Sequence, residues 1–262
     1  MTGPKRKGIV LQPRDRHLLD ELAVMRVIDR EQASRVAPFG SVTRANCRLL
    51  ALTRAGLLRR FFLGTAAGGK KALYLLSSSG ARLVGATSIG PKRTRDELVV
   101  ADLFVAHQTL INEVYCALKY GSEVPDGMRF RRWLSFSAPL DRAIPLVPDG
   151  YVEFGGSGTG LAAFLEVDLS HERLSVWREK VRNYLQCAVS GRFAAQFGRS
   201  RFLVLVICDS RGRMESLRAA TAALTSKIFR FTTFSLIHER GFWSSIWLKP
   251  NGNEPQTLGE TP

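Results

Sequence analysis

The chain has 262 residues, 45% of them hydrophobic, and a formal net charge of +15. This size and composition are sufficient for one or two domains with a sizeable core. The cysteines, Cys47, Cys116, Cys187 and Cys208, form no C-x-x-C pair and have no ligand-spaced histidine, which argues against a zinc site and a disulfide framework. Because the sequence has no run of 18 apolar residues and no signal-peptide core, we expect a cytoplasmic protein without a membrane span.

The positive charge is concentrated in the first third of the chain. Residues 1–95 contain 19 Lys and Arg against 5 Asp and Glu, a net of +14, whereas residues 96–262 contain 19 against 18, a net of +1. Since a solvated surface mixes both signs, this excess predicts a phosphate-binding surface, with double-stranded DNA as the favoured partner. An anionic membrane surface is the weaker alternative.

After a basic arm at residues 1–11, the sequence predicts three helices and a hairpin. Apolar residues at helical spacing predict a first helix over 13–27. Asp29 is suited to cap a second helix over 30–36, and Ser41 a third that ends near Arg54. Strands are predicted over 58–63 and 72–76, around a Gly-rich turn. This order resembles the winged helix-turn-helix fold, over residues 12–85.

By this resemblance the third helix would enter the major groove of DNA, and the hairpin would meet phosphates. The residues expected to bind DNA are Arg44, Asn46, Arg48, Arg54, Arg59, Arg60, Lys70 and Lys71. Winged helices also serve as protein-docking modules, which is the alternative for this domain.

A linker is predicted over residues 86–95, where Gly90 and Pro91 accompany a basic cluster without apolar periodicity. A second domain is predicted over 96–250 and a flexible tail over 251–262. The expected helices of this domain are 96–120, 172–190 and 213–229, and the expected strands are 130–139, 146–154, 161–169, 202–208, 232–238 and 243–248. This pattern predicts an α/β domain with a mixed sheet, and hence an α+β chain.

Two carboxylates mark the candidate site of the second domain. Asp149 and Glu166 are 17 residues apart, each at or beside the end of a predicted strand, and pairing of these strands would bring them together. Two converging carboxylates suit Mg²⁺, which takes its other ligands from water and substrate phosphate. Asp149 alone could be a turn residue. Glu166 and Asp168, however, are predicted to share one face of a strand, where a metal ion would offset their repulsion.

Three phrases carry a resemblance to a known family. The order helix, strand, hairpin, helix, strand, with Pro148-Asp149 and Glu166-x-Asp168, resembles the restriction-endonuclease-like, PD-(D/E)xK fold. Combined with the winged helix, the phrases Pro148-Asp149-Gly150-Tyr151, Phe164-Leu165-Glu166-Val167-Asp168 and the helical segment Trp177 to Tyr184 resemble the replication-relaxation family of plasmid and mobile-element proteins over residues 12–210. That family is related to mobilisation relaxases.

The resemblance implies a site that cleaves a phosphodiester with Mg²⁺ or Mn²⁺. Asp149, Glu166 and the main-chain carbonyl of Val167 would hold the ion. The nuclease pattern has lysine where this chain has Asp168, so Lys180 on the following helix would supply the missing cation. The expected catalytic residues are therefore Asp149, Glu166, Asp168 and Lys180, with water as the preferred nucleophile and Tyr184 as the alternative.

We therefore expect a DNA-binding, metal-dependent endonuclease or relaxase-like protein that nicks DNA at a plasmid or mobile-element origin. The resemblance leaves open a homodimer and accessory mobilisation or replication proteins as further partners. The alternative is a non-catalytic DNA-binding replication or mobilisation factor, or a regulator, with a decayed nuclease fold.

Overall fold

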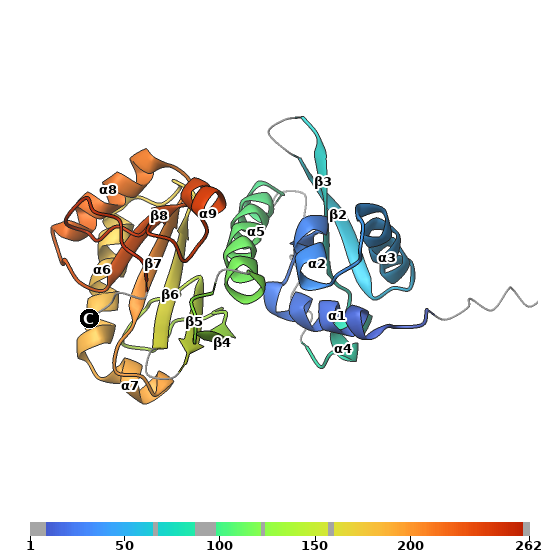
Figure 1. The fold of residues 1–262 in the computed structure, drawn as a ribbon, viewed down its shortest axis with the longest axis horizontal. Coiled ribbons are helices and arrows are strands. Elements are labelled where there is room, and N and C mark those ends of the chain that lie inside the picture. Colours follow the sequence, from blue (N-terminus) through green and yellow to red (C-terminus); the bar gives the residue numbers. More distant parts are fainter. Residues whose placement is uncertain (1–8, 65–67, 87–97, 122–123, 157–159, 259–262) are drawn as a thin grey trace, which may run out of the picture. The chain divides into compact units, whose positions relative to one another are not determined.

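The structure is a computed structural model that describes residues 9–64, 68–86, 98–121, 124–156 and 160–258, without the side chains of 98–103. The chain divides into two compact units, Met1–Tyr120 and Gly121–Pro262, drawn in blue to green and in green to red in Figure 1. The structure combines helices with mixed sheets, so the predicted α+β class is confirmed. Nearly all of the predicted arm and linker lies outside the described residues. Within the described residues, no helix has the length and apolar character needed to cross a membrane.

The first unit begins with three helices and a hairpin, as predicted. These elements are α1 (Pro13–Met25), α2 (Arg30–Val36), α3 (Val42–Arg54), β2 (Leu58–Gly64) and β3 (Lys70–Leu76), followed by α4 (Ser78–Leu83). Both predicted caps form, since Asp29 Oδ1 accepts from Gln32 N and Ser41 Oγ accepts from Arg44 N. A two-residue strand that the sequence did not predict, β1 (Ile28–Asp29), pairs with β3 and gives the sheet order β1-β3-β2.

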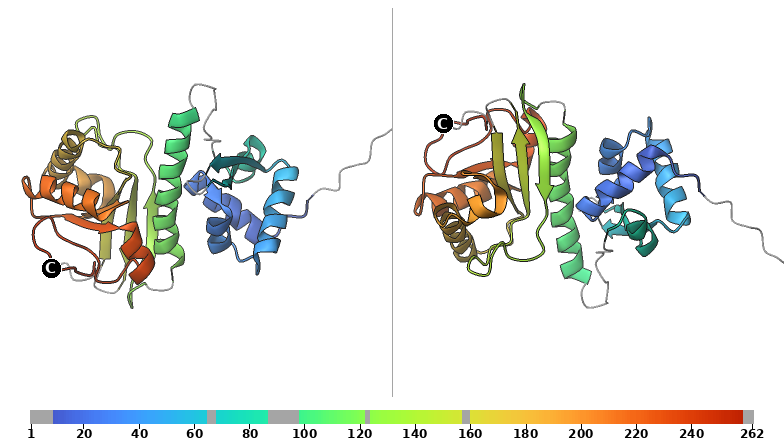
Figure 2. Two further views of the ribbon diagram at one scale, coloured as in Figure 1. Left: turned by 90° about the horizontal axis from the view of Figure 1, so that it is seen from above. Right: turned by 90° about the horizontal axis from the view of Figure 1, so that it is seen from below.

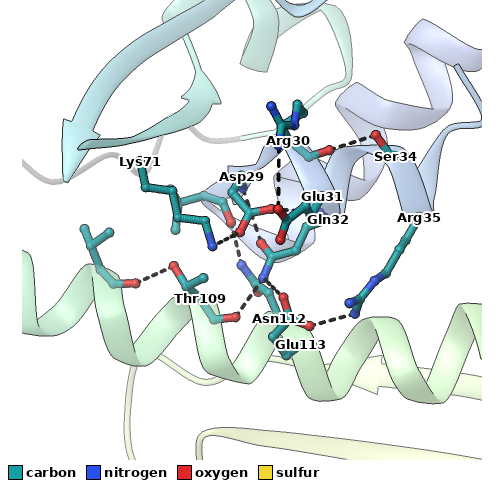
Figure 3. A network of polar contacts seen from close by, with 12 residues as sticks. Asp29, Arg30, Glu31, Gln32, Ser34, Arg35, Lys71, Thr109, Asn112 and Glu113 are labelled. Carbon is teal, nitrogen blue, oxygen red and sulfur yellow. Dashed lines mark hydrogen bonds and ion pairs between the residues drawn. The ribbon is translucent and has the colours of Figure 1, made fainter. Parts of the chain in front are cut away.

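Helix α5 (Leu98–Tyr120) is attached to the rest of the first unit by polar contacts, many of which Figure 3 shows. Asn112 Nδ2 donates to the carbonyls of Met25, at 3.1 Å, and Val27. Gln32 Nε2 donates to Thr109 O and Glu113 Oε1, both at 2.9 Å, and Arg35 Nη1 donates to Glu113 Oε2 at 2.6 Å. A second group of contacts joins Tyr115 Oη and Lys119 Nζ to the Glu21 carboxylate of α1, each at 2.6 Å.

The division of the chain therefore falls after Tyr120, whereas the sequence predicted a second domain from residue 96. The pattern of α5 did not indicate its neighbours, because its apolar residues cover much of the helix circumference. Polar residues such as Asn112 and Glu113 fix its place, and they bind backbone and side chains that lie about 80 residues earlier in the sequence.

The second unit is built on a mixed sheet with the strand order β4-β5-β6-β7-β8. Strands β4 (Arg129–Leu134), β5 (Gly150–Gly155) and β6 (Gly160–Asp168) are antiparallel neighbours. Strands β6, β7 (Leu203–Cys208) and β8 (Phe229–Thr233) are parallel. The parallel strands are connected through α6 (Leu174–Val189) and α7 (Arg192–Phe197), and then through α8 (Arg211–Ala222). The carboxyl ends of these strands therefore lie along one edge of the sheet, where β5 begins.

Helices α6 and α8 lie side by side on one face of this sheet (Figure 1, Figure 2). Trp177 and Val181 of α6 and Leu217 of α8 are buried there, in one apolar cluster that includes Phe164, Phe229 and Phe231 of the sheet. These apolar contacts fix which side of α6 faces the strands, and they determine the direction in which its polar residues point.

The last predicted elements were partly wrong. The helix expected over 213–229 ends at Ala222, and the strand expected over 232–238 is replaced by the end of β8 and by α9 (Phe234–Arg240). Thr233 starts this helix because its Oγ1 accepts from Leu236 N at 3.4 Å. The strand expected over 243–248 is reduced to isolated bridges, Phe231 with Leu248 and Trp247 with Gln256.

Candidate functional site

The register of β5 and β6 brings Asp149 and Glu166 to the same point of the sheet. Gly150 pairs with Leu165 in the antiparallel ladder, so the preceding residue Asp149 lies opposite Glu166. Asp149 N donates to Leu165 O at 3.1 Å, which extends the ladder by one bond. Opposite residues of antiparallel strands place their Cβ atoms about 5 Å apart on one face. We call these two residues the acid pair.

The Glu166 carboxylate is held by two side chains of α6. Lys180 Nζ donates to Glu166 Oε2 at 3.0 Å, and Tyr184 Oη donates to Glu166 Oε1 at 2.6 Å. Lys180 also lies 3.0 Å from Glu172 Oε1, in the loop before the helix. Lys180 and Tyr184 are one helical turn apart, and Glu166 is only 2% exposed. The buried carboxylate is thus enclosed by a cation and a hydroxyl.

The pKa values show that these groups interact. Burial raises the pKa of Glu166 to about 7, with a further contribution from the charge of Asp149, while Lys180 and Tyr184 act in the opposite direction. For Lys180, burial lowers the pKa, but the charges of Glu166, Glu172 and Asp149 outweigh it and raise the pKa above its usual range. Lys180 therefore stays charged at neutral pH beside the acid pair.

Asp168 has a different partner from the one expected. Arg213 of α8 donates to both of its carboxylate oxygens, Nε to Oδ1 at 2.7 Å and Nη2 to Oδ2 at 2.8 Å. Ser170 N donates to Asp168 Oδ1 at 2.8 Å as well. The repulsion between the two acids on β6 is thus offset by Arg213 and Lys180, with no need for a metal ion at Asp168. Sequence reasoning missed Arg213 because it lies 45 residues later, on a helix that also contains Arg211 and Arg218.

Val167 contributes its backbone to the candidate site. Its N–H donates to Asp149 Oδ2 at 2.7 Å, while its side chain is buried. In an extended strand the N–H and C=O of one residue point towards the same neighbouring strand. The Val167 carbonyl therefore points to the side on which Asp149 lies, which is the orientation that the proposed ligand role requires.

The oxygen atoms of the acid pair and of the Val167 backbone suit a hard cation such as Mg²⁺, if Lys180 moves away from Glu166. Within the described part of the chain, no group of three or more His, Cys, Asp or Glu side chains is arranged to hold a metal ion. Mg²⁺ needs only one or two carboxylates, with water and substrate supplying other ligands. The acid pair and the Val167 carbonyl meet that requirement, provided that Lys180 moves away from Glu166 Oε2 when the ion binds.

In the first unit, six of the eight residues expected to bind DNA are exposed. They are Arg44 and Asn46 on α3, Arg54 at its end, Arg59 and Arg60 on β2, and Lys70 on β3. The Arg60 guanidinium lies over the ring of Phe62, 5.2 Å from its centroid, and Phe62 is itself 49% exposed. These side chains give α3 and the hairpin a cationic outer surface.

Arg48 and Lys71 bind buried aspartates of the first unit. Arg48 Nε donates to Asp15 Oδ1 at 2.8 Å, its Nη2 also donates to Asp15, and the Asp15 side chain is fully buried. Lys71 Nζ lies 2.5 Å from Asp29 Oδ2, at the cap of α2 (Figure 3). In this structure both cations therefore stabilise the fold, a role that their spacing in the sequence did not distinguish from DNA contact.

Comparison with known families places the chain among related sequences. Residues 19–200, more than half of the chain, match the family model described as replication-relaxation. The matched range includes Asp149, Glu166 and Lys180 as well as most of the first unit. No curated protein and no solved structure gives a significant match.

The contrast between Arg48 and Arg44 gives a first prediction. Arg48→Ala leaves the Asp15 carboxylate buried without its cation and should cost about 2–3 kcal/mol of stability, whereas Arg44→Ala should cost little. Burial raises the pKa of Asp15, but hydrogen bonds from Arg48 and Gln12 outweigh it and lower the pKa below its ordinary value of 3.8. The stabilisation is therefore present above that value and is lost as pH falls, so the two variants should converge in acid.

Urea unfolding can measure this difference unit by unit. All four tryptophans, at positions 133, 177, 243 and 247, lie in the second unit. Arg48→Ala should shift the transition followed by far-UV circular dichroism more than the one followed by tryptophan fluorescence. Equal stability of the Arg48→Ala and Arg44→Ala variants at neutral pH would contradict a structural role for Arg48.

Proposed function

The chain belongs to the replication-relaxation family, and from this membership and the geometry of its second unit we propose that it is a DNA nickase. It binds double-stranded DNA through the first unit and, with Mg²⁺ or Mn²⁺, cleaves one strand at the acid pair. Membership of the family indicates a role in replication or mobilisation, and a plasmid or mobile-element origin is the DNA we infer. The single observation that carries the catalytic proposal is the position of Asp149 opposite Glu166, with Lys180 beside them.

Asp149, Glu166 and the Val167 carbonyl would hold the ion, which when bound supplies polarisation of the phosphate and a lowered pKa of the attacking water. Asp149 is already positioned by the N–H of Val167, and Glu166 by Tyr184. Lys180 binds Glu166, and its charge interacts with both acids of the acid pair. Once released from Glu166, Lys180 can offset charge on the cleaved phosphate.

Water is the nucleophile that the environment of Tyr184 favours. The Tyr184 ring is fully buried, and its hydroxyl proton is donated to Glu166. Burial and the charge of Glu166 raise the pKa of Tyr184 well above its usual value, so the phenolate needed for covalent attack is disfavoured. Tyr184 thus acts by positioning Glu166 and does not take part as a reacting group.

A second function, a non-catalytic DNA-binding replication or mobilisation factor, is favoured by a specific observation. Asp168 replaces the motif lysine and is bound by Arg213, and both oxygens of Glu166 are occupied by Lys180 and Tyr184. If Lys180 keeps this position in the presence of metal ions, the acid pair binds no ion and the second unit does not cleave DNA.

A nicking assay separates the two functions. Supercoiled plasmids that carry candidate origins should be converted to the open circular form with Mg²⁺ or Mn²⁺. Asp149→Asn and Glu166→Gln should each lower the rate by about 10²-fold or more, because each removes a charged ligand. Glu179→Gln is the matched control, since Glu179 is an exposed acid on the same helix as Lys180. Wild-type protein that nicks none of these plasmids with either ion would exclude the enzymatic function.

DNA binding by the first unit has its own test. Arg59→Ala should weaken binding of every duplex to a similar extent and make the salt dependence shallower by about 0.9 per lost phosphate contact. Arg44→Ala should weaken binding and also reduce the preference for one sequence over another, because Arg44 is proposed to face base edges. Fluorescence anisotropy measures both effects, with Arg182→Ala on the outer side of α6 as control. Equal affinity of all three variants and wild type would point to a protein-docking role.

A further inference from the structure

Strand β4 contains a β-bulge that places two arginines side by side. Arg129 pairs with Gly155 and Phe130 with Phe154, but Arg132 pairs with Glu153, so Arg131 is the extra residue. A bulge re-aims the side chains of the strand that contains it. Here Arg131 lies across Gly155, with its Nε 3.3 Å from the position that a Cβ atom would occupy. Arg131 therefore shares the Glu153 side of the sheet with Arg132.

A third arginine reaches the same place from the segment before β7. Arg199 Nη2 donates to Glu153 Oε2 at 3.3 Å, and its Nη1 lies 3.6 Å from the Cβ position of Gly160. Gly155 and Gly160 are paired across the hairpin of β5 and β6. Two guanidinium groups thus lie over a pair of glycines, whose missing side chains leave room for this close approach. We call Arg131, Arg132 and Arg199 the arginine cluster.

The arginine cluster has more positive charge than its one acid requires. Glu153 accepts from Arg132 Nη2 at 2.5 Å and from Tyr151 Oη at 2.8 Å, in addition to Arg199. Burial raises the pKa of Glu153, but Tyr151, Arg132 and Arg199 outweigh it and lower the pKa, so the carboxylate is ionised. Three guanidinium groups against one carboxylate leave a local excess of two positive charges.

The arginines are also accessible and incompletely paired. The side chains of Arg132 and Arg199 are 41% and 42% exposed. The Nε–H of Arg132 is buried without an acceptor. The side chain of Arg131 is exposed and has no hydrogen bond or ion pair within the described residues. A purely structural role explains Arg132 and Arg199, which both bind Glu153, but it does not explain Arg131 or the local excess of positive charge. Guanidinium groups that present free N–H donors suit the oxygens of a phosphate.

We propose that the arginine cluster is a phosphate-binding site for the backbone of the DNA strand that the second unit acts on. This inference rests on the proposed function. Glu153 lies four residues from Asp149 along β5, about 13 Å at the rise of a strand. The cluster thus holds the DNA backbone a few nucleotides away from the acid pair, and it keeps the strand in place during cleavage.

Arg131→Ala is the sharpest variant because Arg131 has no acidic partner in the described structure, so its loss should not affect folding. In the full-length protein, this substitution should weaken binding of a fluorescein-labelled duplex about 3- to 10-fold at low salt. It should also reduce the slope of the logarithm of affinity against the logarithm of salt concentration by about 0.9. Arg199→Ala should have a similar effect, and Arg131→Lys, which keeps the charge, should restore much of the affinity. Arg182→Ala is the matched control and should bind as wild type does.

A second measurement distinguishes failure of this inference from failure of the proposed function. Tripolyphosphate should raise the unfolding temperature of wild-type protein more than that of Arg131→Ala protein. If wild type binds no DNA but this Arg131-dependent shift is present, the DNA-processing function fails while the anion site stands. If the Arg44 and Arg59 variants lose DNA binding while Arg131→Ala protein matches wild type in both measurements, the arginine cluster is not a phosphate site. The proposal is also overturned if the Arg131→Ala substitution changes neither the affinity for DNA nor the shift in unfolding temperature that tripolyphosphate causes.

Discussion

The arrangement of the second unit depends on a buried carboxylate. Glu166 is 2% exposed and lies opposite another acid, so without a cation its ionised form would cost several kcal/mol. Lys180 and Tyr184 provide that compensation from one side of α6, and the apolar contacts of Trp177 and Val181 hold this side of the helix against the sheet. The chemistry of the acid pair therefore depends on both the register of the sheet and the rotation of α6.

The same principle recurs in both units: within the described residues, each buried acid is paired with a cation on another part of the chain. The pairs are Asp15 with Arg48, Glu21 with Lys119, Asp29 with Lys71, Glu153 with Arg132, Glu166 with Lys180 and Asp168 with Arg213. These pairs use only a part of the 38 Lys and Arg. Arg44 and Arg59 in the first unit and Arg131 in the second form no such pair within the described residues, and we assign them to DNA phosphates or bases. Arg132 and Arg199 bind Glu153 but are assigned to the same phosphate site as Arg131, because one carboxylate does not neutralise three guanidinium groups.

The sequence predicted those features of the structure that local chemistry controls. Asp29 and Ser41 capped the helices expected of them, and the spacing of Asp149 and Glu166 matched the register of the paired strands. Prediction from the sequence failed where long-range contacts determine which partner a side chain binds. The sequence pattern of α3 does not distinguish Arg44, which faces solvent, from Arg48, which binds Asp15. Likewise, nothing in the local pattern showed that Arg213 would bind Asp168 or that Asn112 would attach α5 to the first unit.

The central claim is that the acid pair accepts a divalent ion when Lys180 moves aside. The most direct measurement is anomalous diffraction from crystals of the protein soaked in Mn²⁺. We predict an anomalous peak about 2 Å from oxygens of both Asp149 and Glu166, with Lys180 displaced from Glu166 Oε2. Crystals without such a peak, in which Lys180 still binds Glu166 at a saturating concentration of Mn²⁺, would contradict the account.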